Sequence, residues 1–143
     1  MLIALALAAS QPPETPPDPC PIFARLLAAA RETPAFASVG QALANGEAIV
    51  PGFDAGDCRI DAAGGFECDL WSMGSHNFPD WREPVACPGI TDVPGPRRSF
   101  NRYRALIAGN GLRIEYGVQC QGCVGNATSW FRVSFEGQGR PQE

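Results

Sequence analysis

The sequence predicts an α+β domain, in which one or two N-terminal helices and a short middle helix pack on a mostly antiparallel sheet of about five strands. Three observations lead to this fold class. Apolar residues recur at helical spacing after Cys20, period-two alternation marks two hairpins further along the chain, and the number of cysteines, 6, is even. We therefore expect a disulfide-stabilised domain.

The composition favours a folded chain with a mild charge. Of the 143 residues, 45% are hydrophobic and 18% are charged, which is sufficient for a packed core. Gly (16) and Pro (14) are frequent, as expected for short elements joined by turns. The 11 basic residues are all arginine, a bias typical of GC-rich bacterial sequences. The net charge of −4 gives no reason to expect nucleic acid as a partner.

The first residues have the pattern of a signal peptide. Residues 2–9 form an unbroken apolar run, and the small side chains of Ala8 and Ser10 suit cleavage before Gln11. The run is shorter than the roughly 20 residues that span a bilayer, so we expect no transmembrane segment in the mature chain. A buried N-terminal helix is the alternative interpretation.

This cleavage site divides the chain into three segments. Residues 1–10 are the expected signal peptide, residues 11–19 a proline-rich spacer, and residues 20–143 a single α+β domain. We expect the mature protein to be exported, to the periplasm or to the cell exterior.

Two segments after the spacer have helical periodicity. The apolar positions of the first share one helix face: Ile22, Phe23, Leu26, Leu27 and Ala30. Asp18 or Cys20 could cap its start, and Pro34 ends it. The second helix has a similar apolar side, formed by Phe36, Val39 and Leu43. It stops at Gly46, and a capping-box pattern predicts the short middle helix over residues 80–87.

The first hairpin is predicted from alternation on either side of residues 61–65, which read Asp-Ala-Ala-Gly-Gly. Cys58 and Ile60 alternate with polar residues before this turn, and Phe66 and Cys68 do so after it. Pairing Ile60 with Phe66 puts Cys58 directly opposite Cys68 on the same face of the sheet.

The second hairpin is predicted from Asn110-Gly111, which suits a two-residue type I′ turn because both of its positions need positive φ. This turn predicts one apolar face made of the pairs Ile107–Ile114, Ala105–Tyr116 and Tyr103–Val118. A last strand over residues 130–135 adds further inward side chains, namely Phe131, Val133 and Phe135.

An exported setting favours disulfides among the cysteines. Three bridges are predicted: Cys58–Cys68, Cys20–Cys87 and Cys120–Cys123. The first follows from the register of the first hairpin, the second would tie two predicted helices together, and the third follows by elimination. Exchange of Cys87 onto Cys120 or Cys123 is an open alternative.

The Cys-Gln-Gly-Cys sequence at residues 120–123 also allows two other chemistries. A redox-active pair needs its first thiol at a helix N-terminus, whereas this segment follows a predicted strand. A zinc site would need two further ligands at suitable spacing. We therefore expect no metal and no cofactor, and a thiol–disulfide protein using Cys120 and Cys123 is kept as one alternative function.

Catalysis by a base near neutral pH would have to use His76, the single histidine. Several carboxylates surround the first hairpin: Asp54, Asp57, Asp61, Glu67 and Asp69. They lack the spacing of a calcium loop, and Glu67 and Asp69 alternate with core positions, so we expect both to face solvent. A small exported hydrolase using His76 and a carboxylate is the other alternative function.

Arginines gather on and before the second hairpin, in a stretch without acids between Asp92 and Glu115: Arg97, Arg98, Arg102, Arg104 and Arg113. The predicted register directs Arg102, Arg104 and Arg113 to one outer surface, and Trp130 alternates onto the same side. We expect a binding module rather than an enzyme, which recognises an anionic protein, lipid headgroup or cell-wall component through this surface. A solvated polar face with a partly buried Trp130 is the alternative.

Overall fold

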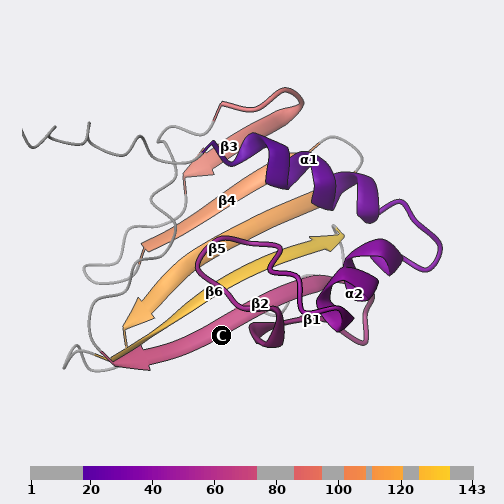
Figure 1. Ribbon diagram of the computed structural model, residues 1–143. Helices are drawn as coiled ribbons and strands as arrows, with labels where there is room; N and C mark the ends of the chain where they lie inside the picture. Colours follow the sequence, from indigo (N-terminus) through magenta and orange to yellow (C-terminus); the bar gives the residue numbers. More distant parts are fainter. Residues whose placement is uncertain (1–17, 74–85, 95–101, 109–110, 121–125, 136–143) are drawn as a thin grey trace, which may run out of the picture.

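A computed structural model describes residues 18–73, 86–94, 102–108, 111–120 and 126–135, in which two helices pack on one face of an antiparallel sheet of six strands (Figure 1). The helices are α1 (Cys20–Ala29) and α2 (Ala37–Ala44), and a 3-10 turn, η1, spans Ala55–Asp57. The strands are β1 (Cys58–Ile60), β2 (Phe66–Met73), β3 (Ile90–Pro94), β4 (Arg102–Ala108), β5 (Leu112–Cys120) and β6 (Asn126–Phe135). Their order in the sheet is β1-β2-β6-β5-β4-β3.

The α+β class and two of the three predicted disulfides are confirmed, and the helices and strands differ in number from the prediction. The described sheet has six strands rather than about five, because β3 was not expected. The expected middle helix falls largely on residues 80–85, which lie outside the described residues, and Ala86 and Cys87 are not helical. No helix in the described part of the chain is long and apolar enough to cross a membrane.

Helix α1 begins next to a carboxylate and buries one side against the sheet. The backbone N–H of Cys20 donates to Asp18 Oδ1 at 3.0 Å. Proline is tolerated in the first turn of the helix, because backbone N–H groups there have no partner within the helix. Its buried side chains are Phe23, Leu26 and Ala29. They share one face because residues three and four apart lie together on a helix.

Helix α2 is capped by a glutamate from the preceding turn. Ser38 donates from its Oγ and its backbone N to Glu32 Oε1, at 2.6 and 3.0 Å. These two hydrogen bonds, the side-chain one first, lower the pKa of Glu32, so the cap stabilises the fold at neutral pH and is lost as the pH falls through that lowered pKa. The helix buries Val39 and Ala42 and ends before Gly46, which has a positive φ of 80°.

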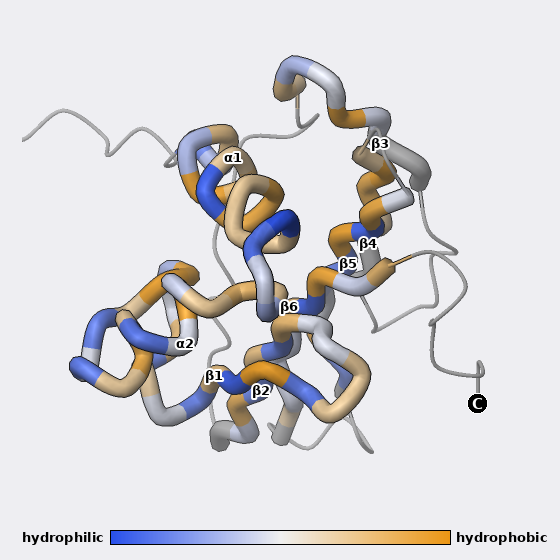
Figure 2. The backbone as a smooth tube through the Cα atoms, turned by 90° about the vertical axis from the view of Figure 1, so that its right-hand side faces the viewer, coloured by the Kyte–Doolittle hydropathy of each residue, from blue (hydrophilic) through white to orange (hydrophobic). Residues whose placement is uncertain are grey.

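The core lies between the helices and one face of the sheet, and Figure 2 shows both helices on the same side of the strands. Phe131 of β6, fully buried, is at the centre of this core. Its ring centroid is 6.4 Å from Phe23 of α1, 6.1 Å from Phe66 of β2 and 6.3 Å from Tyr116 of β5. Separations of this size are favourable for aromatic pairs, so Phe131 joins a helix and two neighbouring strands.

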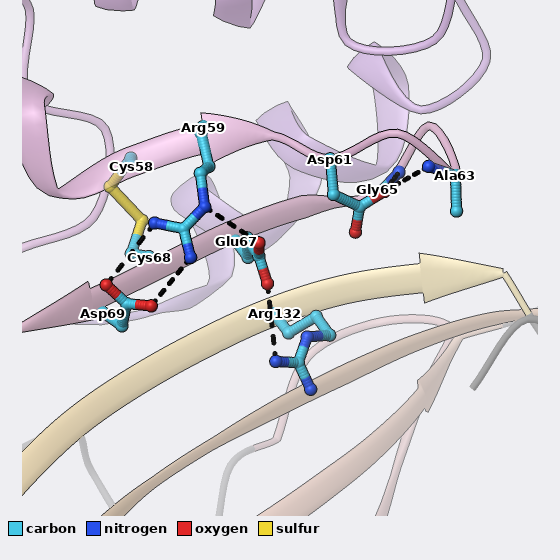
Figure 3. A network of polar contacts seen from close by, with 9 residues as sticks. All are labelled: Cys58, Arg59, Asp61, Ala63, Gly65, Glu67, Cys68, Asp69 and Arg132. Atoms are coloured by element: carbon cyan, nitrogen blue, oxygen red, sulfur yellow. Dashed lines mark hydrogen bonds and ion pairs between the residues drawn. A yellow bond between two sulfur atoms is a disulfide. The ribbon is translucent and has the colours of Figure 1, made fainter. Parts of the chain in front are cut away.

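The first hairpin has the register that its sequence predicts. Cys58 pairs with Cys68 and Ile60 pairs with Phe66. Asp61 stabilises the turn, because its Oδ1 accepts hydrogen bonds from the backbone N–H groups of Ala63 and Gly65, both at 2.9 Å (Figure 3).

The predicted register of the second hairpin is wrong by one residue. Leu106 pairs with Ile114 and Ala108 with Leu112, so the connection comprises residues 109–111 instead of a two-residue turn. Gly111 has a φ of 75°, as expected at the last position of a three-residue hairpin loop. Because a shift of one residue turns a strand over, Leu106 rather than Ile107 joins the buried core.

Two disulfides lie in the described part of the chain, one within the first hairpin and one between distant segments. Cys58–Cys68 joins β1 to β2, and Cys20–Cys87 joins the start of α1 to the segment before β3. Both are pairs that the sequence predicts. In the chain-entropy model, the Cys20–Cys87 bridge, with a sequence separation of 67 residues, stabilises the fold by about 4 kcal/mol. The Cys58–Cys68 bridge, with a separation of 10 residues, contributes about 2.5 kcal/mol. The third predicted pair includes Cys123, which lies outside the described residues.

Candidate functional site

The candidate site is the outer face of the sheet, which is the face opposite α1 and α2. Its residues alternate along each strand with those of the core. At its centre is a row of charged side chains in which the sign alternates from strand to strand: Arg59 of β1, Glu67 of β2, Arg132 of β6 and Glu115 of β5. Directly opposed residues lie within contact distance, so this register brings each arginine beside a carboxylate.

Glu67 bridges two arginines with its two carboxylate oxygens (Figure 3). Arg59 Nε lies 2.9 Å from Oε1, and an Arg132 terminal nitrogen lies 3.4 Å from Oε2. The Glu67 side chain is only 10% exposed, whereas the Arg59 side chain is 50% exposed. The prediction that Glu67 faces solvent is therefore wrong, because its neighbours on β1 and β6 cover it.

Arg59 also contacts Asp69, which extends the network along β2. The guanidinium fork approaches both Asp69 oxygens, at 2.8 and 3.4 Å. Hydrogen bonding to Asp69 and attraction to Glu67 together raise the pKa of Arg59 against the opposing effect of burial. The bidentate geometry fixes the plane of the guanidinium, so this arginine is held in one orientation.

Arg113 is paired on the outer face as well. Its Nε lies 2.7 Å from Glu115 Oε1 on the same strand, and Arg113 is directly opposite Ser134 of β6. Three arginines and three carboxylates therefore form contacts among the described outer-face residues: Arg59, Arg113, Arg132, Glu67, Asp69 and Glu115. Their formal charges cancel.

Two tryptophans flank this charged network. Trp130 of β6 is half-buried, and the Arg132 guanidinium lies 5.8 Å from its ring centroid, within the range of a cation–π contact. Trp71 of β2 is directly opposite Thr128 and is 59% exposed, more than expected for a large apolar side chain. Trp71 and Trp130 are thus diagonal neighbours on the outer face.

The sequence-predicted surface is only partly assembled by this register. Trp130 and Arg113 both lie on the outer face, but Arg102 and Arg104 pair with Val118 and Tyr116. Along β4 these two backbone positions alternate in step with the buried Leu106, not with the outer-face positions. Their side chains are not among those that the structure describes. The expected grouping of three arginines on one face depended on the two-residue turn, which the structure does not have.

Sequence reasoning missed Arg59, Glu115 and Arg132 as members of the outer face. Arg59 could have been found, because the correctly predicted register of the first hairpin already places it opposite Glu67. Arg132 alternates with Phe131 and could have been assigned to the outer face in the same way. The pairing of Arg132 with Glu67 could not have been predicted, since the strand order that puts β6 beside β2 is a long-range property.

The carboxylates around the first hairpin have local structural roles. The Asp54 backbone N–H donates to Asp57 Oδ2 at 2.8 Å in the capping box of η1, and Asp61 holds the turn. His76, on which the hydrolase hypothesis depends, lies outside the described residues.

One group of potential metal ligands occurs in the described part of the chain, at the start of α1. Ligand atoms of Asp18, Cys20 and Cys87 lie within 4.8 Å of one another. The two sulfurs are bonded to each other in a disulfide, so they are not thiolates and this group does not provide a metal site.

Comparison with models of known protein families, with curated proteins and with solved structures gave no match. The function must therefore be inferred from the residues and contacts described above.

Glu67 and Asp69 provide a matched pair of tests, because both carboxylates contact Arg59. We expect Glu67→Gln to lower the free energy of unfolding by about 1–3 kcal/mol, since a mostly buried charged hydrogen-bond acceptor of two arginines is lost. Asp69→Asn, at a half-exposed site, should cost less than about 1 kcal/mol. Urea unfolding of the oxidised proteins measures both values, and equal losses would contradict the bridging role of Glu67.

Proposed function

We propose that this protein is an exported, disulfide-stabilised binding module whose contact surface is the outer face of the sheet. The observation that best supports this proposal is the fixed arrangement of arginines, carboxylates and tryptophans on that face. Paired arginines and aromatic side chains lose little conformational freedom on binding, and both are enriched in protein interfaces.

The charge balance of this face favours a protein as the partner. A lipid headgroup or an anionic cell-wall polymer attracts surfaces with an excess of cations, whereas the arginines at 59, 113 and 132 are matched by carboxylates. A protein surface can present its own alternating charges, and such complementarity gives specificity. Binding of a purely anionic partner would depend instead on Arg102 and Arg104.

Export is supported by the disulfides together with the apolar run at residues 2–9. Disulfides persist in the periplasm and outside the cell and are rare in the reducing cytosol. The bridge between Cys20 and Cys87, which are 67 residues apart, stabilises the fold only in a compartment that is oxidising enough to maintain it. We propose that the mature protein begins at Gln11 and resides in the periplasm or outside the cell.

Export can be tested by mass spectrometry of the full chain expressed in a bacterium with an intact secretion system. We expect the recovered protein to begin at Gln11 and to take up no alkylating reagent before reduction. Retention of residues 1–10, with cysteines that are alkylated at once, would contradict export. Replacing Ala8 by Arg should block cleavage and serves as the matched control.

The binding surface can be tested by pull-down from the native cell envelope. We expect the partner captured by the wild-type protein to be lost with the double variant Arg113→Gln/Trp130→Ala, because both side chains lie on the outer face. Arg25→Gln is the control, since Arg25 is an arginine on α1 that is likewise paired with a glutamate, Glu47 at 2.8 Å, and its side chain is 45% exposed, against 35% for Arg113.

Two outcomes of this pull-down would contradict the proposal. One is capture by the folded double variant at the wild-type level. The other is capture of a non-protein partner that is lost only with the double variant Arg102→Gln/Arg104→Gln. That result would identify an anionic ligand and a different surface. Circular dichroism of each variant establishes that the fold is intact.

A further inference from the structure

The Cys20–Cys87 bridge lies beside a carboxylate, and three side chains converge at the start of α1. Their ligand atoms, which are one oxygen of Asp18 and the two sulfurs, lie within 4.8 Å of one another. In the oxidised chain the sulfurs are bonded to each other and are not metal ligands. Reduction changes the chemistry of this group, because it converts the bridge into two thiols next to an acid.

Of the two described bridges, this one is the more accessible to a reductant. Cys58 and Cys68 are 8% and 1% exposed and belong to the core. Cys87 is also buried, whereas Cys20 is partly exposed at the first residue of α1. Thiol–disulfide exchange needs access of the attacking thiolate to a sulfur, so a dithiol reductant reaches Cys20 before the sulfurs of the first hairpin.

Each cysteine of this bridge is held in place by backbone contacts that do not involve the bridge. Cys20 begins α1, whose first turn is closed by the Phe23 N–H donating to the Pro19 carbonyl at 3.0 Å. The Cys87 carbonyl accepts from the Ile90 N–H at 3.2 Å, in a tight turn that leads into β3. The two cysteine Cα atoms are 5.4 Å apart, so after reduction both thiols remain within reach of one ion.

Asp18 is positioned by its own hydrogen bond. Its Oδ1 accepts the Cys20 N–H at 3.0 Å, which holds the side chain at the start of the helix and leaves the second oxygen to coordinate an ion. Two thiolates and a carboxylate at this distance repel one another unless a cation lies between them. The arrangement therefore favours a metal ion over a redox-active thiolate, which cationic neighbours stabilise and a carboxylate does not.

We propose that reduction of the Cys20–Cys87 bridge creates a zinc site formed by Asp18, Cys20 and Cys87. A dithiol reductant is oxidised to its disulfide while the bridge becomes two thiols, and both thiols lose their protons as Zn²⁺ binds. Water completes the four ligands, as in other zinc sites with three protein ligands. Zinc suits this set because it accepts both sulfur and carboxylate oxygen, and its tetrahedral ligand atoms are about 3–4 Å apart.

The zinc ion replaces the structural link that reduction removes. The bridge joins the first turn of α1 to the segment before β3, and a zinc ion held by the same side chains joins the same two segments. The helix thus stays connected to this edge of the sheet under reducing conditions. The inference does not depend on the proposed binding function, because this site lies at the start of α1 and not on the outer face.

The site can be tested by zinc titration of the mature chain carrying Cys120→Ser and Cys123→Ser, which removes two further cysteines that could bind metal. We expect no binding by the oxidised protein and one zinc ion per chain after reduction with a phosphine, which leaves the metal free. Cobalt in place of zinc should give the charge-transfer absorption of thiolate ligands, and zinc should raise the melting temperature of the reduced protein.

Two matched carboxylate variants in the same background test the role of Asp18. Asp18→Asn should weaken zinc binding about tenfold or more, because a charged ligand is lost. Glu47→Gln should leave it unchanged, since Glu47 is an exposed carboxylate paired with Arg25. Cys20→Ser should abolish binding although Cys58 and Cys68 are still present.

Four results would each overturn the proposal. They are a reduced protein that binds no zinc, unchanged binding by Cys20→Ser, equal zinc affinities of Asp18→Asn and Glu47→Gln, and a reduced protein that unfolds and is not refolded by zinc. Circular dichroism before and after the addition of zinc distinguishes the last of these from the first.

Discussion

The alternation of side chains along β6 is the constraint on which both faces of this protein depend. β6 lies between β2 and β5, and its register with both strands is fixed over most of its length. One set of its residues, Phe131 and Val133, is buried against the helices, and the other set, Trp130 and Arg132, lies on the outer face. A slip of one residue would exchange these sets, placing Arg132 in the core and Phe131 in solvent. The core and the charged surface are therefore specified by the same pairing.

The disulfides extend this arrangement to elements that are too short to hold their positions alone. β1 has three residues, and its bridge from Cys58 to Cys68 keeps Arg59 beside Glu67 and Asp69. The bridge from Cys20 to Cys87 joins the first turn of α1 to the far edge of the sheet, next to β3. Loops of this kind are closed before folding in an oxidised chain, which lowers the entropy of the unfolded state. The Cys58–Cys68 bridge and the charged network thus stabilise the β1 edge of the sheet, and the Cys20–Cys87 bridge connects α1 to the opposite, β3 edge.

Features set by nearby residues were predictable from the sequence, and those set by distant residues were not. The first hairpin register, the Cys58–Cys68 pair and both helices follow from local alternation and spacing. The second hairpin was predicted one residue out of register, because Asn110-Gly111 suits a two-residue turn while the burial of Leu106 and Ala108 favours a three-residue loop. The contact of Glu67 with Arg132 depends on strand order across 65 residues, which no local pattern encodes.

The most direct test is to measure the register of β6 in the oxidised protein by nuclear magnetic resonance. We expect nuclear Overhauser effects between backbone protons of Phe131 and those of its two directly opposed residues, Cys68 on β2 and Tyr116 on β5. Contacts that place Trp130 or Arg132 opposite Cys68 and Tyr116 would contradict the assignment of the two faces, and with it both the core and the outer-face network.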